Sequence, residues 1–181
     1  MILTETKLKG AYTIEIEKLE DPRGFFARAW CVKEFEVHGL NTRLVQVNVS
    51  YSKKRKTLRG MHYQGAPYEE SKLLRCTSGA VYDVIIDLRR NSPTYKQWIG
   101  VELTSENYRM LYVPENFAHG FQTLVDDTEV TYQVSQFYAP GAEQGIRYND
   151  PVFDIDWPHG VQVISDKDSS WPDYLPQDGA W

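Results

Sequence analysis

Arg59, His62 and Lys72 are the first residues whose types and spacing suggest chemistry. Residues 58–64 read Leu-Arg-Gly-Met-His-Tyr-Gln, and Lys72 opens another strand-like run further along the chain. Because imidazole exchanges a proton near neutral pH, a histidine among polar neighbours suits general acid–base catalysis. A single histidine can equally serve the fold by satisfying hydrogen bonds in a core. The geometry of the strand that carries it decides between these roles.

Gly60 controls which way these side chains point. Side chains alternate along a strand, so His62 and Gln64 share one face and Arg59 should point the other way. Glycine inside a strand often marks a bulge, in which one strand carries an extra residue. A bulge at Gly60 would turn Arg59 and His62 toward one ligand.

Tyr132 and His119 are two further candidates. Val130, Tyr132 and Val134 alternate with polar residues, which predicts that Tyr132 faces the apolar interior of a sheet. A buried tyrosine usually needs only a partner for its hydroxyl. His119 lies where a turn passes into a strand, and two histidines on neighbouring strands would suggest a metal site. The sequence has no His-x-His pair and no suitably spaced carboxylate for a third ligand, so no metal is predicted.

Short strands must position most of these residues. Residues 44–52 alternate cleanly, with valines and Tyr51 on the face expected to pack and Gln46 and Asn48 on a polar face. Turn residues separate many such runs, which predicts an all-β sandwich or closed barrel. The remaining runs are residues 7–16, 25–30, 72–76, 81–88, 98–103, 109–113, 120–124 and 129–137.

A few segments depart from the β pattern. Residues 32–39 predict two helical turns closed by Gly39, and residues 21–24 (Asp-Pro-Arg-Gly) predict a turn. The basic run at 53–56 is interpreted as a solvated turn. Residues 150–181, rich in Pro, Asp and Trp, predict an irregular tail packed on the barrel. Since no linker or repeat divides the chain, residues 1–181 are predicted to form one domain.

Composition excludes several classes of protein. The net charge of -5 argues against general nucleic-acid binding. Cys31 and Cys76 make neither a metal spacing nor a disulfide framework, which favours a reducing, cytoplasmic setting. The N-terminus lacks the pattern of a signal peptide, and no apolar run approaches the roughly 18 residues of a membrane span. We therefore expect a soluble protein that is not associated with a membrane.

A series of motifs runs in order from about residue 21 to residue 168 and resembles the dTDP-4-dehydrorhamnose 3,5-epimerase family. The motifs are Arg-Gly-Met-His-Tyr-Gln at 59–64, Lys72-Leu73, Asp-Val-Ile-Ile-Asp-Leu-Arg at 83–89, Ser92-Pro93-Thr94, Pro114, Phe-Ala-His-Gly-Phe at 117–121, Tyr132, Tyr138, Asn149-Asp150-Pro151 and Trp157-Pro158. The resemblance implies a cupin-like jelly-roll barrel with a short helix near the N-terminus and an irregular C-terminal tail. It also implies a homodimer that acts on a nucleotide-diphosphosugar without a metal or redox cofactor.

The resemblance also assigns catalytic roles. The family reaction inverts C3 and C5 of a 4-keto-6-deoxyhexose, and the neighbouring C4 ketone allows both protons to leave if an enolate is stabilised. His62 is similar to the family's base, and Asp168 matches the carboxylate that orients it, as in the Ser-His-Asp triad. Tyr132 matches the acid on the opposite face. Lys72 matches the cation beside the developing enolate, where a fixed positive charge acts most strongly.

Ligand contacts follow from the same resemblance. Arginine forks suit the diphosphate, and Tyr138 resembles the residue that stacks on the pyrimidine. The implied substrate-binding residues are Arg23, Arg28, Gln46, Asn48, Arg59, His119, Tyr138, Glu143 and Lys167.

Arg28 departs from the family pattern, which commonly has a glutamate at this position. A glutamate can accept a hydrogen bond from thymine N3–H, whereas arginine only donates and so fits the acceptors of cytosine. A CDP-linked sugar is therefore an alternative to the dTDP-linked one. Inversion at only C3 or only C5 is a second possibility, and a cupin that binds the sugar nucleotide without catalysis is a third.

Overall fold

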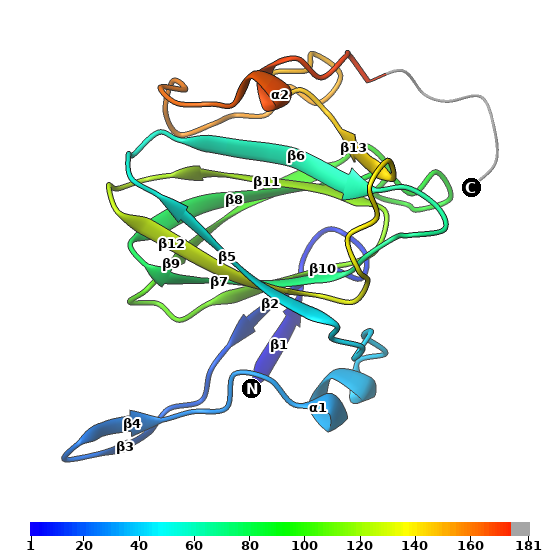
Figure 1. The fold of residues 1–181 in the computed structure, drawn as a ribbon. Coiled ribbons are helices and arrows are strands. Elements are labelled where there is room, and N and C mark those ends of the chain that lie inside the picture. Colours follow the sequence, from blue (N-terminus) through cyan, green and yellow to red (C-terminus); the bar gives the residue numbers. More distant parts are fainter. Residues whose placement is uncertain (175–181) are drawn as a thin grey trace.

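Residues 1–174 are described by the computed structural model, and strands dominate them (Figure 1). One sheet has six strands in the order β1-β2-β10-β7-β12-β5, the other has five in the order β13-β6-β11-β8-β9, and β3 and β4 form a separate hairpin. The prediction of an all-β sandwich or barrel is confirmed, and the two sheets form a jelly roll. The strands are β1 (Ile2–Glu5), β2 (Tyr12–Glu15), β3 (Leu19–Asp21), β4 (Gly24–Phe26), β5 (Gln46–Ser52), β6 (Leu58–Gln64), β7 (Lys72–Ser78), β8 (Ala80–Asp87), β9 (Trp98–Thr104), β10 (Met110–Val113), β11 (Phe117–Thr123), β12 (Thr128–Val134) and β13 (Glu143–Gly145), and the helices are α1 (Val32–Val37) and α2 (Asp166–Ser169).

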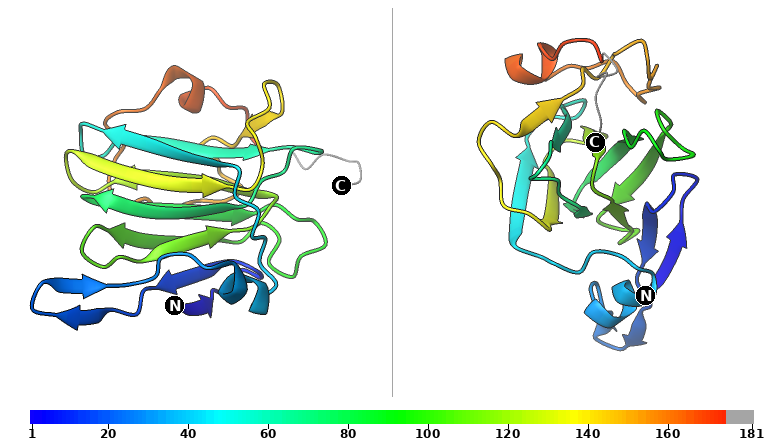
Figure 2. Two further views of the ribbon diagram at one scale, coloured as in Figure 1. Left: turned by 60° about the horizontal axis from the view of Figure 1, so that its bottom comes forward. Right: turned by 90° about the vertical axis from the view of Figure 1, so that its right-hand side faces the viewer.

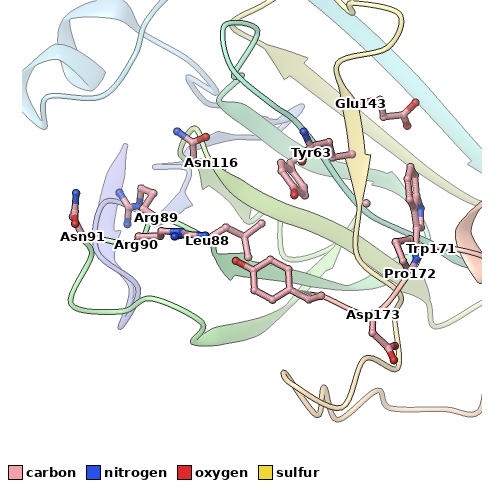
Figure 3. A pocket seen from close by; sticks show the side chains of 13 residues that line it. Tyr63, Leu88, Arg89, Arg90, Asn91, Asn116, Glu143, Trp171, Pro172 and Asp173 are labelled. Carbon is pink, nitrogen blue, oxygen red and sulfur yellow. The ribbon is translucent and has the colours of Figure 1, made fainter. Parts of the chain in front are cut away.

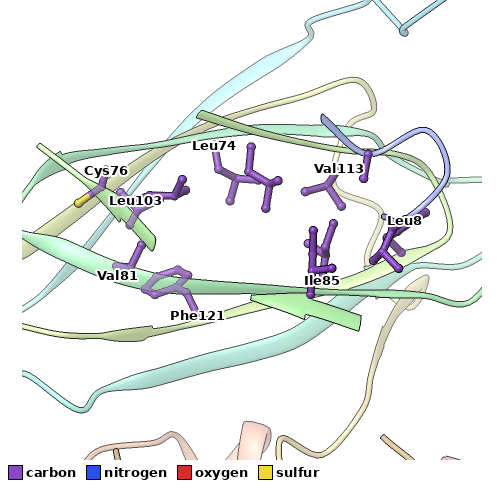
Figure 4. Close-up of a cluster of buried hydrophobic side chains, with 13 residues drawn as sticks. Leu8, Leu74, Cys76, Val81, Ile85, Leu103, Val113 and Phe121 are labelled. Atoms are coloured by element: carbon purple, nitrogen blue, oxygen red, sulfur yellow. The ribbon is translucent and has the colours of Figure 1, made fainter. Parts of the chain in front are cut away.

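Apolar side chains fill one half of the space between the sheets (Figure 4). They come from both sheets, for example Leu74 of β7, Ile85 of β8, Phe121 of β11 and Val130 of β12, and all are buried. Tyr132 packs against the same cluster, which confirms that it faces the interior. The packed half supplies most of the stabilising apolar burial inside the barrel.

The bulge at Gly60 is present in β6. In the pairing of β6 with β11, His62 lies opposite His119 and Arg59 opposite Phe121, so two residues of β6 face one residue of β11. Gly60 has a φ of +124°, and a Cβ there would lie 2.5 Å from the Cα of Gly120 in β11. Glycine is required here for both conformation and space.

The polar face of β5 points into the barrel, which corrects the expectation that its apolar face packs. Val47, Val49 and Tyr51 are 62%, 63% and 48% exposed, while Gln46 and Asn48 line an interior cavity. Alternation was predicted correctly, but the inward face was assigned by hydrophobicity alone. Because this part of the interior is a polar cavity, the usual arrangement is reversed.

The N-terminal segment lies on the side of the barrel opposite α2 (Figure 2). The predicted turn at 21–24 joins β3 to β4, and this hairpin projects away from the barrel (Figure 1). Helix α1 ends at Val37, and Gly39 follows with a φ of +68°, as predicted. Phe35 of α1 packs on the outer face of the six-stranded sheet.

The tail covers the outer face of the five-stranded sheet, as predicted for its described part. Phe153, Trp157 and Tyr174 join a cluster that includes Ile86 of β8 and Met61 of β6. Helix α2 was not predicted and is too short to show a periodic pattern. Predictions for residues 175–181 fall outside the described residues. Within residues 1–174, no helix has the length and apolarity needed to cross a membrane.

Candidate active site

His62 and Asp168 form a hydrogen-bonded pair between β6 and α2. His62 Nε2 lies 2.7 Å from Asp168 Oδ1, and the second carboxylate oxygen accepts the Gly60 N–H at 3.1 Å. Ser165 caps α2 by accepting from the Asp168 N–H, which fixes the helix that carries the carboxylate. Burial alone would raise the pKa of Asp168, but the hydrogen bond and charge of His62 hold it below its usual value.

Tyr132 approaches the same cavity from the other sheet. The cavity has a volume of about 280 Å³ and is lined by His62 of β6 and Tyr132 of β12, among others. Burial raises the pKa of the Tyr132 phenol, the charge of Glu70 raises it further, and the charge of Arg59 opposes this. The phenol therefore keeps its proton across the neutral range, as a proton donor must.

Lys72 is buried at the start of β7 and also lines the cavity. Its Nζ donates to the carbonyl oxygen of His62 at 3.3 Å and pairs with Glu70 at 3.2 Å. Glu70 in turn accepts from the Gln64 amide at 3.3 Å. These contacts hold a positive charge beside the histidine.

Gln46, Tyr138 and Glu143 line the cavity and form a hydrogen-bonded network. Gln46 accepts the N–H of Tyr138 at 3.0 Å, and the Tyr138 hydroxyl donates to Glu143 at 3.2 Å. Lys167 pairs with Glu143. Burial alone would raise the pKa of Glu143, but the hydrogen bond from Lys167 lowers it. The structure thus brings Gln46, Asn48, Tyr138 and Glu143 together at the cavity, and Lys167 contacts one of them, Glu143.

Arg59 and His119 lie near the cavity without lining it. Arg59 donates to Ser52 Oγ at 3.2 Å and to the Tyr51 carbonyl at 2.9 Å. His119 is buried and pairs with Asp83 at 3.0 Å. The His119 side chain therefore lies buried beside His62, its partner in the pairing of β11 with β6.

Arg23 and Arg28 are the two candidates that the single chain does not bring to its own cavity. Arg23 is carried by the projecting hairpin, is 90% exposed and pairs with Asp21. Arg28 follows the hairpin and pairs with Glu34 at 3.2 Å.

Glu70, Tyr63, Gln64 and Val134 also line the cavity and were not predicted as site residues. Glu70 stands two residues before Lys72, so the alternation of an extended chain could have placed both on one face. Within residues 1–174, no group of three or more His, Cys, Asp or Glu side chains is arranged to hold a metal ion.

Comparisons with known proteins agree with this geometry. The family model for dTDP-4-dehydrorhamnose 3,5-epimerase matches residues 5–175. An epimerase of that name from Shigella flexneri is 40% identical over 179 residues, covering 98% of each chain. A dTDP-4-dehydrorhamnose 3-epimerase from Streptomyces niveus is 38% identical over 169 residues, covering 93% of this chain and 81% of the relative.

The crystal structure of dTDP-4-dehydrorhamnose 3,5-epimerase from Bacillus anthracis, with TDP and PPi bound, has a TM-score of 0.92 to this fold. The two chains are 42% identical, and the match covers 96% of this chain and 99% of the other. Fold and sequence together place the molecule among the cupin-like epimerases, which are isomerases. The chain belongs to the dTDP-4-dehydrorhamnose 3,5-epimerase family, so the resemblance of its motifs is confirmed.

Proposed function

We propose that this protein converts dTDP-4-dehydro-6-deoxy-D-glucose to dTDP-4-dehydro-L-rhamnose by inverting C3 and C5. The observation that carries this proposal is that His62 and Tyr132 line one cavity from opposite sheets. Inversion requires that a proton leave one face of the sugar and return on the other. A base and an acid mounted on facing sheets meet that requirement.

His62 serves as the base in this mechanism. A carboxylate can only accept a hydrogen bond, so His62 donates its Nε2–H to Asp168 and keeps the lone pair of Nδ1. Nδ1 takes the proton from C3 or C5, the C–H electron pair moves into the bond toward C4, and the C4 oxygen becomes an enolate. Asp168 then stabilises the imidazolium that has formed.

Lys72 and Tyr132 complete the proton transfer. The Lys72 ammonium is fixed beside His62 and stabilises the enolate oxygen by its charge, which acts strongly because it is already in place when the enolate forms. Tyr132 delivers its proton to the opposite face of the carbon as the ketone re-forms. His62 then releases its proton to solvent and the Tyr132 phenolate takes one up, which restores both groups for the second carbon. The reaction has no net oxidation or reduction, so no redox cofactor is invoked, and no metal is assigned a role.

The nucleotide end of the substrate is assigned to the polar network. Tyr138 stacks on the pyrimidine, Arg59 and Lys167 contact the diphosphate, and Gln46, Asn48 and Glu143 contact the sugar region. His119 contributes by supporting the wall beside His62. We place this chemistry in the cytoplasm.

A homodimer would explain why Arg23 and Arg28 lie away from the cavity of their own chain. Val47, Val49 and Tyr51 form an exposed apolar face on β5, an edge strand, and a second copy would bury it. In that assembly the projecting hairpin reaches the partner's cavity, so that Arg23 and Arg28 act in trans. Sedimentation velocity should show a dimer, and Val49→Asp should shift it toward monomer; a monomeric wild type would contradict the assembly.

Two specific observations favour a different outcome or substrate. The relative named as a 3-epimerase is almost as similar to this chain as the 3,5-epimerases, so inversion at C3 alone is the second candidate. Arg28 favours a CDP-linked sugar if it reads the base. Calorimetry with CDP and dTDP, in wild type and Arg28→Glu, separates a base-reading arginine from one that contacts only diphosphate or solvent.

The decisive experiment is NMR of the dTDP-linked 4-keto sugar incubated with the protein in D2O. Deuterium at both C3 and C5, with inversion at both, supports the proposal. Deuterium at C3 alone identifies the second candidate. No exchange with either dTDP- or CDP-linked substrate would leave a protein that only binds the sugar nucleotide.

A further inference from the structure

A second cavity, of about 860 Å³, adjoins the active cavity, and Figure 3 shows the side chains that line it. Its walls are the loop at residues 88–91, strand β13 and the tail at residues 171–174. Tyr63 and Glu143 line both cavities. The two spaces therefore share β6 and β13 as a common wall.

Among residues 1–174, every charged side chain that lines the second cavity forms an ion pair except Arg90. Arg89, Asp173 and Glu143 each form an ion pair with a residue of opposite charge. Within residues 1–174 the Arg90 side chain forms no ion pair, and its Nε and Nη2 are buried without an acceptor. A partly buried, uncompensated guanidinium is unfavourable. An anion in the cavity would supply the missing partner.

The rest of the lining suits a flat, largely apolar body. Tyr63, Trp171 and Tyr174 contribute aromatic side chains, and Leu88 and Pro172 add aliphatic surface. Figure 3 shows Arg90 on one side of the cavity, Trp171 on the other and Tyr63 between them. The Trp171 N–H is buried and also lacks an acceptor among the described residues.

We propose that this cavity is a binding site for a small organic anion that combines a flat ring with one phosphate or carboxylate group. The guanidinium of Arg90 meets the anionic group, for which its fork of donors is suited. The ring lies among the aromatic side chains. The volume falls within the range of small-molecule sites, which combine an apolar lining with a few convergent polar groups.

Phenyl phosphate is the probe that tests the site, titrated into the full-length protein by calorimetry. Wild type should bind it saturably and equally well with and without saturating dTDP, because the nucleotide is assigned to the other cavity. Arg90→Gln should weaken binding by about tenfold, since a charge-assisted contact is lost. Arg55→Gln removes an exposed arginine that lines neither cavity and should change nothing. Inorganic phosphate and phenol, each carrying half of the chemistry, should bind more weakly than phenyl phosphate.

Asn91→Asp provides a second variant in case Arg90→Gln does not fold. Asn91 is exposed and lines the cavity, so a carboxylate there should repel the probe without disturbing the fold. Absence of saturable binding at millimolar probe, displacement of the probe by dTDP, or equal affinity in wild type and both variants would overturn the site. The titration needs no turnover, so its failure is distinct from a failed exchange assay.

Discussion

The interior of the barrel has two halves that are built from the same strands. In β7, Lys72 lies in the cavity while Leu74 and Cys76 lie in the packed core. In β12, Val134 and Tyr132 line the cavity and Val130 joins the core. Whether a residue belongs to the cavity or to the packed core is set by its position along the strand and not by which strand carries it.

This difference teaches that stability and chemistry are separable within one layer of side chains. The packed half gains from apolar burial and close packing. The cavity half carries buried polar groups that are tolerated because hydrogen bonds and ion pairs satisfy them. Substitutions in the two halves should therefore have opposite signatures.

His62→Ala should produce the largest effect, and it should fall mainly on activity. Removing a general base costs about 10²–10⁴-fold in rate, so deuterium exchange at C3 and C5 should both fall below detection by NMR. The midpoint of urea unfolding should fall only modestly, because Asp168 loses the hydrogen bond from His62 but keeps the one from the Gly60 N–H. His38→Ala, at the exposed end of α1, is the control and should keep full exchange. Exchange above a few per cent of wild type would remove His62 from the role of base.

Leu74→Ala should show the reverse signature. Leu74 is fully buried in the packed half, and truncation of such a leucine lowers the free energy of unfolding by about 2–5 kcal/mol. The rate per folded molecule should stay close to that of wild type. Val37→Ala, which alters a residue that is 83% exposed, should change stability by no more than about 0.5 kcal/mol. A stable Leu74→Ala protein that is inactive would break the division between the halves.

Tyr132→Phe tests the boundary, because Tyr132 contacts the core and lines the cavity. The ring remains, so folding should be nearly unchanged, while the proposed acid is lost. We expect net inversion to fall by about 10²-fold and deuterium exchange to fall less, since His62 can still remove and return a proton. NMR measures both quantities in one sample. Equal losses of exchange and inversion would contradict the placement of base and acid on opposite faces.

Glu70→Gln should have a smaller effect, on kcat more than on KM. Glu70 holds Lys72 by an ion pair and raises the pKa of Tyr132 beyond the effect of burial. Removing the charge of Glu70 should lower the pKa of Tyr132. The alkaline limb of the plot of kcat against pH should therefore move to lower pH. Glu69→Gln, one position away and outside the cavity lining, should leave the profile in place. An unchanged alkaline limb would show that Glu70 does not act through Tyr132.

The smallest expected effect is on stability: Asp168→Asn should remove part of the pH dependence of the free energy of unfolding. The folded pKa of Asp168 is lowered, so its ionised form stabilises the fold at pH values above the unfolded pKa of about 3.9. That contribution is lost as the pH falls through the folded pKa. Urea unfolding at a series of pH values should therefore show the largest difference between wild type and Asp168→Asn near neutrality and a smaller one in acid. If the difference in free energy of unfolding between wild type and Asp168→Asn did not change with pH, ionisation of Asp168 would not contribute to stability.

Local signals in the sequence predicted several features of the fold and site. The helix closed by Gly39, the bulge at Gly60 and the inward direction of Tyr132 each follow from a few neighbouring residues. The pairing of His62 with Asp168 joins residues that are far apart in sequence, and only the family motifs indicated it. Their catalytic roles remain predictions.

Some features depend on contacts that a single stretch of sequence does not encode. The inward face of β5 is polar because a cavity lies beneath Gln46 and Asn48, and alternation is the same for either orientation. Helix α2 is set by the Ser165 cap and by packing near β6. The position of Arg23 depends on how a hairpin leaves the barrel, which its turn residues do not specify. Arg90 could not be identified as a candidate from the sequence, because only the structure shows that its buried Nε and Nη2 lack an acceptor.

The outward valines of β5 also bear on how the chain avoids aggregation. An edge strand with an exposed apolar face is a template for disordered association between unrelated chains. The run Lys53-Lys54-Arg55-Lys56 follows β5 directly and forms the turn into β6. Charged residues that flank an unavoidable apolar strand act as gatekeepers against aggregation. The basic turn lines neither cavity and lies beside the exposed apolar edge of β5, which is the position of such a gatekeeper.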